Sequence, residues 1–176
     1  ALAFARAAGL VAMADDSGLE VDALGGGPGV FSARYAGEGA SSADRIALLL
    51  RNLEGVPAAQ RQARFVALVA VASPDGEVRL CRGSVRGVIA LAPSGAGGFG
   101  YDPVFYMPQF GCTMAELPDA VKNRISHRAR AALRFEQADQ QEVDGGLAGA
   151  GGTDECHGLA GLDLERHAAQ HVDVVV

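Results

Sequence analysis

Two apolar runs joined by a tight turn constrain the fold of this chain more than any other feature. The runs are Phe65–Ala72 and Val78–Leu91, and the segment Ser73-Pro74-Asp75-Gly76 separates them. Proline, aspartate and glycine are turn residues, and such a turn between two apolar runs indicates a β-hairpin. The sequence therefore predicts an antiparallel pair of strands in the middle of the chain.

Further strands are expected on the N-terminal side of this hairpin. The apolar run Leu10–Ala14 predicts a buried strand that delivers the polar segment Asp15-Asp16-Ser17-Gly18 at its end. Residues 19–24 alternate apolar and acidic side chains, which is typical of a half-buried strand. The segment Gly25–Gly29 predicts a flexible loop.

Helices are expected before, between and after these strands in the sequence. Leu2–Gly9 has the pattern of a helix that stops at a glycine. Ser41 and Asp44 have capping-box spacing, and apolar residues at helical spacing follow them: Ile46, Leu49, Leu50 and Leu53. Ser126 is expected to cap a last helix over residues 126–138.

Length, charge and cysteine content indicate how the chain is divided into domains and in which cellular compartment it is expected. The 176 residues suit one domain with its own core. We assign residues 1–139 to it and read 140–176 as an acidic, glycine-rich, disordered tail, in which Arg166 is the only arginine. No signal peptide or membrane-spanning segment is apparent, and the three cysteines form no metal-type pair. A cytoplasmic protein with reduced thiols is expected.

The segment Asp15-Asp16-Ser17-Gly18 carries the first candidate chemistry. Carboxylates at a strand end can hold a hard cation such as magnesium, or accept a proton from an attacking water. Adjacent side chains on a strand point to opposite faces, so only one carboxylate is expected to face a site. The alternative is a solvated turn, since aspartate, serine and glycine are ordinary turn residues.

The segment Phe99-Gly100-Tyr101-Asp102-Pro103 is a second candidate. Its glycine permits close backbone approach, and its two aromatic rings could stack on a planar base while Asp102 reads an edge. The alternative is an aromatic plug in the core.

A third candidate surrounds the only lysine of the chain, Lys122, which is followed by Arg124, His127 and Arg128. A lysine presents a compact charge suited to phosphate, and a helix beginning near His127 would add unsatisfied N–H groups. The alternative is a charged helix face in water. The glycine-rich segment at residues 25–29 lacks the Lys-Ser/Thr of a P-loop.

These segments together resemble the inosine triphosphate pyrophosphatase family, in the family's order and over residues 1 to about 138. Four stretches carry the resemblance: residues 14–24, 28–37, 98–105 and 114–128, the last from Met114-Ala115-Glu116-Leu117 through Lys122 to Arg128.

The resemblance implies an elongated α/β fold with a mixed, strongly curved central sheet flanked by helices, and a homodimer. It implies hydrolysis of ITP, dITP and XTP to a nucleoside monophosphate and pyrophosphate, which cleanses the nucleotide pool. By analogy, Asp16 is the proton acceptor and the Mg²⁺ ligand. The implied substrate-binding residues are Ser17, Phe99, Gly100, Tyr101, Asp102, Lys122, His127 and Arg128, of which Lys122 binds phosphate and the last two read the 6-keto purine.

The chain departs from the family pattern at both ends. The family's Ser/Thr-x-Asn-x-x-Lys phosphate loop and an upstream acidic metal ligand are absent, and we expect them to precede Ala1. The 140–176 segment matches no part of the family. A truncated, non-catalytic nucleotide-binding or dimerisation remnant is therefore the alternative function, and a pyrimidine triphosphate pyrophosphatase is a third.

Overall fold

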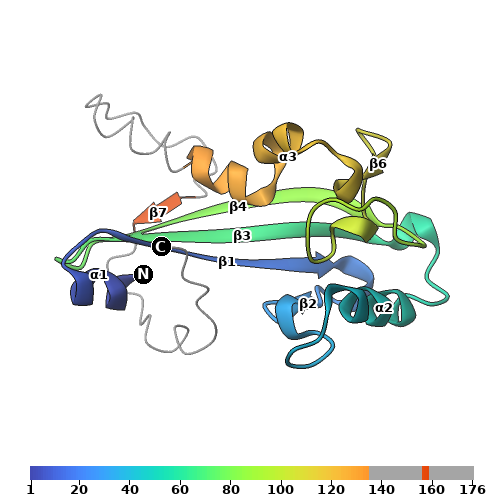
Figure 1. Cartoon of the computed structure of the whole chain (residues 1–176), viewed down its shortest axis with the longest axis horizontal. Coiled ribbons are helices and arrows are strands. Elements are labelled where there is room, and N and C mark those ends of the chain that lie inside the picture. The colour runs from blue at the N-terminus through green and yellow to red at the C-terminus, as the bar shows by residue number, and fades with distance from the viewer. Residues whose placement is uncertain (135–155, 159–176) are drawn as a thin grey trace. The chain divides into compact units, whose positions relative to one another are not determined.

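The computed structural model describes residues 1–134 and the backbone of residues 156–158 (Figure 1). The α-helices are α1 (Leu2–Ala8), α2 (Ser42–Asn52) and α3 (Asp119–Ile125), and residues 127–134 are also helical. The strands are β1 (Ala12–Val21), β2 (Pro28–Gly29), β3 (Gln62–Ala72), β4 (Val78–Ile89), β5 (Phe105–Met107), β6 (Cys112–Thr113) and β7 (Cys156–Gly158). Short 3-10 helices include η2 (Ser32–Arg34), η4 (Asp102–Val104) and η5 (Met114–Glu116). Within the described part, each helix is too short to cross a membrane.

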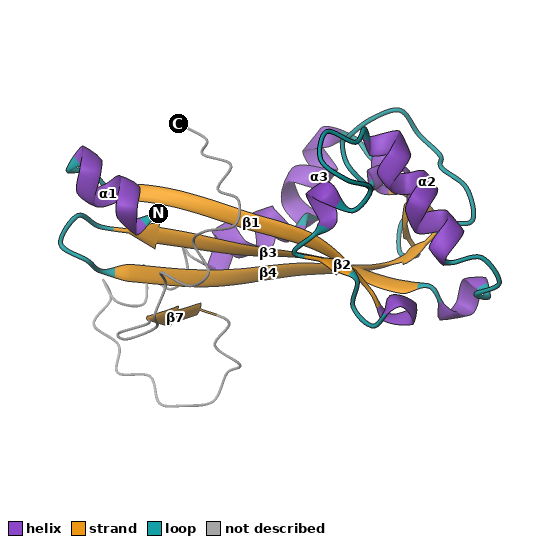
Figure 2. Cartoon of the chain, turned by 90° about the horizontal axis from the view of Figure 1, so that it is seen from below, coloured by secondary structure: helices purple, strands orange, loops and turns teal. Residues whose placement is uncertain are grey.

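The predicted hairpin is confirmed by β3 and β4, which lie next to each other in the sheet and are joined by a short turn (Figure 2). Inside the turn, the Gly76 amide donates to the Ser73 carbonyl at 3.1 Å, and the Ser73 amide donates to the Glu77 carbonyl at 2.9 Å. Gly76 has a φ of 108°, which L side chains rarely adopt. The turn chemistry read from the sequence therefore sets the register of the two longest strands.

The strand end expected at Asp15–Gly18 is wrong, and so is the alternative of a solvated turn, because β1 continues through this segment as one strand as far as Val21. Leu19 and Val21 lie in the core and their backbone extends β1 beyond the acidic pair. The buried strand expected at Leu10–Ala14 is also wrong in burial, since Leu10 and Met13 are exposed. The polar segment thus interrupts the apolar pattern of a strand without ending it.

The expected α/β class is confirmed, but the expected mixed sheet is not. The strand order is β2-β1-β3-β4-β5-β6, with β7 paired to β4. Four pairs with a defined register, β1–β2, β4–β5, β4–β7 and β5–β6, are all antiparallel. Short connections favour this arrangement, since parallel strands need a crossover of roughly a dozen residues or more. The strong curvature expected of the sheet finds no support either.

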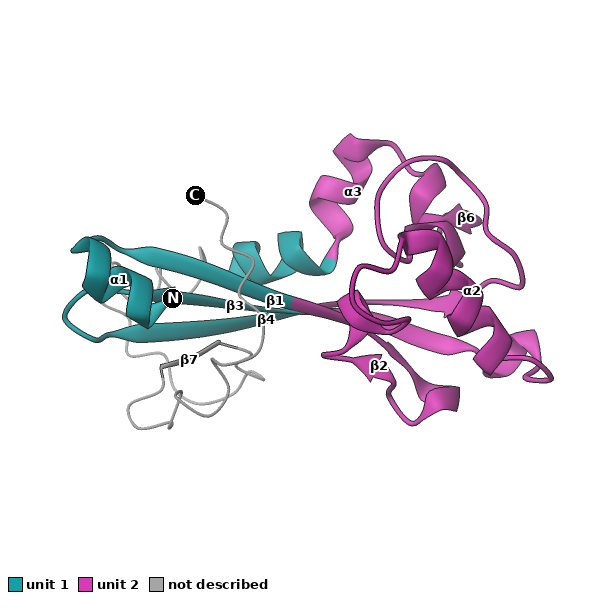
Figure 3. Cartoon of the chain, turned by 60° about the horizontal axis from the view of Figure 1, so that its bottom comes forward, with its two compact units in different colours: residues 1–16, 67–83, 127–176 teal, residues 17–66, 84–126 magenta. Residues whose placement is uncertain are grey.

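The chain divides into two compact units, each made of several sequence segments (Figure 3). Unit 1 holds residues 1–16, 67–83 and 127 onward, and unit 2 holds residues 17–66 and 84–126. The expected boundary at residue 139 lies outside the described residues, as does the 140–176 segment except for β7. In unit 1, the small residues Ala67, Val69 and Ala131 form a buried cluster.

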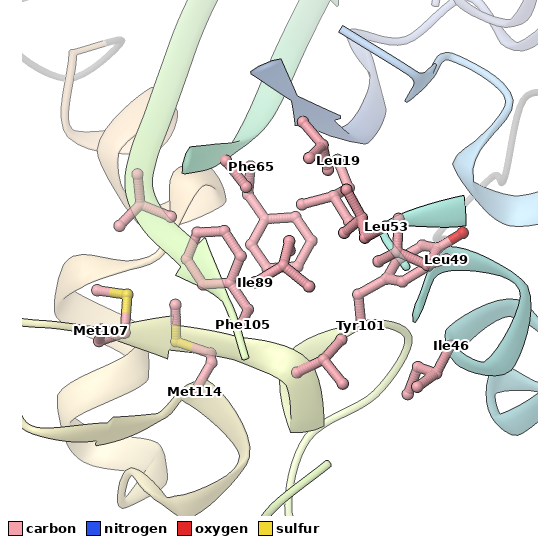
Figure 4. Packing of buried hydrophobic residues seen from close by; sticks show 14 of the residues in the cluster. Leu19, Ile46, Leu49, Leu53, Phe65, Ile89, Tyr101, Phe105, Met107 and Met114 are labelled. Carbon is pink, nitrogen blue, oxygen red and sulfur yellow. The ribbon is translucent and has the colours of Figure 1, made fainter. Parts of the chain in front are cut away.

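The main core lies in unit 2, where α2 packs its apolar face inward. Ser41 and Asp44 form the predicted capping box, with the Asp44 amide donating to Ser41 Oγ at 3.1 Å and the Ser41 amide donating to Asp44 Oδ2 at 3.0 Å. Phe65 and Phe105 stack in a tilted arrangement with centroids 4.4 Å apart (Figure 4). Fully burying one such ring contributes about 1.5–3 kcal/mol. This core anchors the turns that carry several candidate residues.

The last predicted helix, expected over residues 126–138, is helical over residues 127–134, and its remaining residues lie outside the described part. Ser126 has an extended conformation, with φ −61° and ψ 158°, between α3 and the helical residues 127–134. These angles suit the residue that precedes a helix, as predicted. The sequence analysis missed α3, because its inward residues Val121 and Ile125 give only two apolar positions at helical spacing.

The expectation of reduced thiols is wrong for Cys81. Cys81 is buried and disulfide-bonded, and the β4–β7 register places it opposite Cys156. Cys112 is a free thiol.

Candidate functional site

The turn from Phe99 to Asp102 in unit 2 places its two aromatic rings in opposite environments. The Phe99 side chain is exposed, with 68% of its surface accessible, whereas Tyr101 is 4% accessible and belongs to the core. Gly100 between them has a φ of 60°, a conformation that glycine adopts without steric cost. The two alternatives for this segment therefore apply to different rings: Tyr101 is the core aromatic, and Phe99 is the aromatic exposed at the surface.

Lys122 of α3 lies beside this turn and contacts its acidic residue. The Lys122 ammonium lies 3.6 Å from Asp102 Oδ2, and the two side chains are only 14% and 10% exposed. Asp102 Oδ2 also accepts a hydrogen bond of 3.2 Å from the Phe99 amide. Asp119 Oδ1, which is largely exposed, lies 3.6 Å from the same ammonium. Lys122 is therefore a nearly buried cation held at the base of the turn that presents Phe99.

Gly98 makes room for this arrangement. A Cβ at residue 98 would overlap the Asp102 carboxylate and would lie 2.9 Å from the Lys122 ammonium, and the φ of Gly98 is 75°. Both the conformation and the space therefore exclude a side chain there.

Tyr101 is tied to a second loop of unit 2 through Ser32. The Tyr101 hydroxyl donates to the Ser32 carbonyl at 2.9 Å, and Ser32 Oγ accepts from the Leu19 amide at 2.8 Å while donating to the Gly29 carbonyl at 2.6 Å. Burial raises the pKa of Tyr101 to about 12, so its hydroxyl remains a donor at physiological pH. Ser17 lies in β1 two residues before Leu19. The hydrogen bond from the Leu19 amide to Ser32 therefore connects this part of β1 to the residue that accepts from Tyr101.

The acidic pair of β1 lies in unit 1 and shows the expected division of faces. Asp15 is partly buried and its Oδ2 accepts a 2.5 Å hydrogen bond from Arg128 Nε, whereas Asp16 is exposed. Adjacent residues of a strand point to opposite sides, so the two carboxylates serve different surroundings. Asp15 is the structural partner of Arg128, and Asp16 is the carboxylate available for chemistry.

His127 is buried at the start of the helical residues 127–134 in unit 1, which argues against a purely solvated charged face. The pKa of His127 is lowered to about 4, mainly by burial and also by the neighbouring Arg128, while Asp15 acts in the opposite direction. Gly83 permits this burial, because a Cβ there would overlap the His127 carbonyl and lie 3.0 Å from the Cα of Ala131. His127 is therefore neutral at neutral pH.

No preformed metal cluster accompanies these groups. Across residues 1–134, the structure contains no group of three or more histidine, cysteine, aspartate or glutamate side chains that could hold a metal ion. An exposed carboxylate such as Asp16 still fits magnesium, which commonly takes one or two carboxylates together with substrate phosphates.

The candidate residues thus fall into two groups, one in each unit. Unit 1 holds Asp16, His127 and Arg128, and unit 2 holds Ser17, Lys122 and the turn from Phe99 to Asp102. Sequence reasoning missed the residues that support them, namely Ser32, Gly83, Gly98 and Glu116. Only Glu116 had a local signal, because Thr113 and Glu116 have capping-box spacing.

Comparison with known proteins agrees with the resemblance found in the sequence. The model of the Ham1 family matches residues 1–138. A dITP/XTP pyrophosphatase from Geobacillus kaustophilus is 56% identical over 133 residues, which cover 76% of this chain and 65% of that protein. The chain therefore spans slightly less than two thirds of the length of this relative.

Solved structures of Ham1 proteins are also similar to this chain. The Ham1 protein of Staphylococcus aureus matches with a TM-score of 0.74 and 44% identity, covering 80% of this chain and 72% of that one. A HAM1 protein from Coxiella burnetii matches with a TM-score of 0.73 and 42% identity, covering 78% of this chain and 71% of that one.

Proposed function

The chain belongs to the Ham1 family, and we propose that it takes part in hydrolysing the non-standard purine nucleoside triphosphates ITP, dITP and XTP. The products are the nucleoside monophosphate and pyrophosphate, so that deaminated purine nucleotides are removed from the pool. The name of the Geobacillus relative, dITP/XTP pyrophosphatase, supports this substrate class.

One observation carries the proposal furthest: a nearly buried cation of α3 lies beside the turn that carries an exposed aromatic ring. Lys122 contacts Asp102, Asp102 accepts from the Phe99 amide, and the Phe99 ring is open to solvent. A triphosphate nucleotide offers an anion and a planar base, which are the two chemical groups that this turn can bind. Tyr101 and Gly100 support the turn, and Ser17 is the further proposed substrate contact.

Asp16 is the proposed proton acceptor. A water attacks the α-phosphorus and gives its proton to the Asp16 carboxylate, and the bond from the α-phosphorus to the bridging oxygen breaks to release pyrophosphate. An exposed carboxylate that accepts no hydrogen bond from Arg128 is better suited to this role than Asp15, which does.

Two groups of unit 1 are proposed to select the base. The neutral imidazole of His127 and the Arg128 guanidinium both offer N–H donors. Hypoxanthine and xanthine present an oxygen acceptor at position 6, where adenine presents an amine. A site built from donors rejects adenine, because the polar groups would remain unpaired.

Magnesium is the proposed cofactor, with Asp16 as its ligand in this chain. The ion would neutralise charge on the triphosphate, as divalent cations do in phosphoryl chemistry. A cytoplasmic homodimer is proposed for the assembled protein, without nucleic acid or membrane as a partner.

Release of pyrophosphate tests the proposal. The purified chain is incubated with magnesium and with ITP, dITP, XTP, ATP, dTTP or UTP in turn, and pyrophosphate and monophosphate are quantified. Selective turnover of the first three substrates supports the proposal, whereas preference for dTTP or UTP supports a pyrimidine enzyme. Binding of ITP without any turnover supports the non-catalytic alternative.

A further inference from the structure

The segment Ser94–Gly98 leads into the Phe99 turn, yet nothing apolar anchors it. All five of its residues are exposed, and three of them are glycine. Burial of apolar surface is the main force that fixes a loop, and this loop has almost none to bury. Its position must therefore depend on polar contacts and on close backbone packing.

Glu116, at the end of η5, supplies the polar contacts. Its Oε1 accepts a 2.8 Å hydrogen bond from Ser94 Oγ, and its Oε2 accepts a 2.8 Å hydrogen bond from the Thr113 amide. Thr113 Oγ1 lies 2.9 Å from Glu116 Oε2 and 2.8 Å from the Ser94 carbonyl, so its single hydrogen serves one of these acceptors at a time. One carboxylate therefore connects the start of the loop to β6.

Backbone contacts continue the attachment along the loop. The Gly97 amide donates to the Ala115 carbonyl at 3.1 Å, and the Ser94 amide donates to the Pro103 carbonyl at 2.8 Å. A Cβ at Gly95 or at Gly97 would lie 2.8 Å from backbone atoms of Ala115. The loop thus lies directly on the backbone of η5, and its glycines are required for that approach.

We propose that Glu116 is a positioning residue, which fixes the Ser94–Gly98 loop on η5 and thereby sets where Phe99 and Asp102 meet the nucleotide. The inference rests on the proposed function in one respect, namely that Phe99 and Asp102 contact the substrate.

The electrostatics of Glu116 favour positioning over direct contact with the substrate. The Thr113 amide is the largest cause that holds the pKa of this carboxyl below its ordinary value, and the Ser94 and Thr113 hydroxyls act in the same direction. The group is therefore an anion at neutral pH. An anion repels a triphosphate, so its contribution to binding has to pass through the loop that it holds.

Three variants and one control test the proposal on the full chain. Glu116→Ala removes both acceptors, Ser94→Ala removes one donor, and Glu116→Gln retains an acceptor and the side-chain shape. Glu54→Ala is the matched control, because Glu54 is an exposed acid in the same unit whose side chain makes none of these contacts. Steady-state kinetics with XTP are measured together with amide hydrogen exchange at Gly97 and Phe99.

For Glu116→Ala we expect a roughly tenfold higher KM with kcat within about twofold, since uniform binding is lost and the chemical groups are unchanged. Amide exchange at Gly97 and Phe99 should rise by at least about tenfold, as expected for loss of a local closing interaction. Ser94→Ala should lie between Glu116→Ala and wild type, Glu116→Gln should recover part of both effects, and Glu54→Ala should match wild type.

Unchanged exchange in Glu116→Ala overturns the inference, and so does a fall in kcat at constant KM. Failure of the proposed function can be distinguished from failure of the inference about Glu116. A wild-type chain that turns over none of the nucleotides removes that function, while the exchange measurement still decides whether Glu116 holds the loop.

Discussion

The Lys122 ammonium lies 3.6 Å from Asp102 Oδ2, and both side chains are largely buried. The pair joins α3 to the turn that exposes Phe99, and the separation exceeds a close hydrogen-bonded ion pair. Lys122 therefore retains hydrogen-bonding capacity for a second anion. A phosphate bound here would share the ammonium with Asp102, and this competition sets how strongly Lys122 contributes to binding.

Replacing Lys122 by alanine should weaken triphosphate binding by roughly tenfold to a hundredfold, the range expected for a lost hydrogen bond to a charged group. The dependence of affinity on salt should also become shallower, because one screened attraction is gone. Titration calorimetry with ITP at two ionic strengths measures both effects. Arg124→Ala is the control, since Arg124 is an exposed cation on the same helix. Equal losses in the two variants would contradict a specific role for Lys122.

A side chain at residue 98 should disrupt the same pair. In Gly98→Ala, the new Cβ overlaps the Asp102 carboxylate, and overpacking of this kind costs about 1–3 kcal/mol. Gly111→Ala separates this effect from backbone strain, because Gly111 has a similar φ of 68° but no atom within 4 Å of its Cβ position. Urea unfolding should show the larger loss for Gly98→Ala, and the idea fails when the two variants lose equal stability.

Substitution of the neighbouring carboxylates Asp15 and Asp16 should affect different kinetic parameters. Asp16→Asn should reduce kcat by at least about a hundredfold, the usual range for a lost general base, while ITP binding largely survives. Asp15→Asn should instead raise KM, because Arg128 loses the carboxylate that orients it. Single-turnover rates and equilibrium binding measured on both variants separate the two roles. Near-normal turnover of Asp16→Asn would remove Asp16 from the proposed role.

Burial of His127 should make the folded chain sensitive to acid. The imidazole takes up a proton near pH 6.5 in the unfolded chain, but only near a pKa of about 4 in the folded chain. Between these values the unfolded state binds the extra proton, so stability falls as the pH decreases and is unaffected by this group above pH 6.5. The full shift corresponds to about 3 kcal/mol.

Urea unfolding of the wild type and of His127→Asn at pH 7, 5.5 and 4.5 measures this effect. Other groups titrate in the same range, so the informative quantity is the difference between the two chains at each pH. That difference should shift in favour of the variant as the pH falls. A constant difference across the three values would contradict the burial of a neutral imidazole.

Turns and helix caps could be predicted where they depend on residues that are close together in the sequence. The Ser73–Gly76 turn and the capping box of Ser41 and Asp44 each depend on a few adjacent residues, and both appear where they were predicted. The segment Asp15–Gly18 was expected at the end of a strand, with a solvated turn as the alternative, because its residue types fit turns and strands alike. Its extended conformation is decided by the apolar residues that follow it and by its neighbours in the sheet.

The sequence by itself determined the hairpin, the helix α2 and the identity of the candidate residues, because turn chemistry, capping and order of motifs are written along the chain. Tertiary structure decided how those residues are used. Packing exposes Phe99 and buries Tyr101, pairs Asp15 with Arg128 and leaves Asp16 in solvent, and places Glu116 under a glycine loop. These outcomes depend on contacts between residues up to 113 positions apart, which no local pattern encodes.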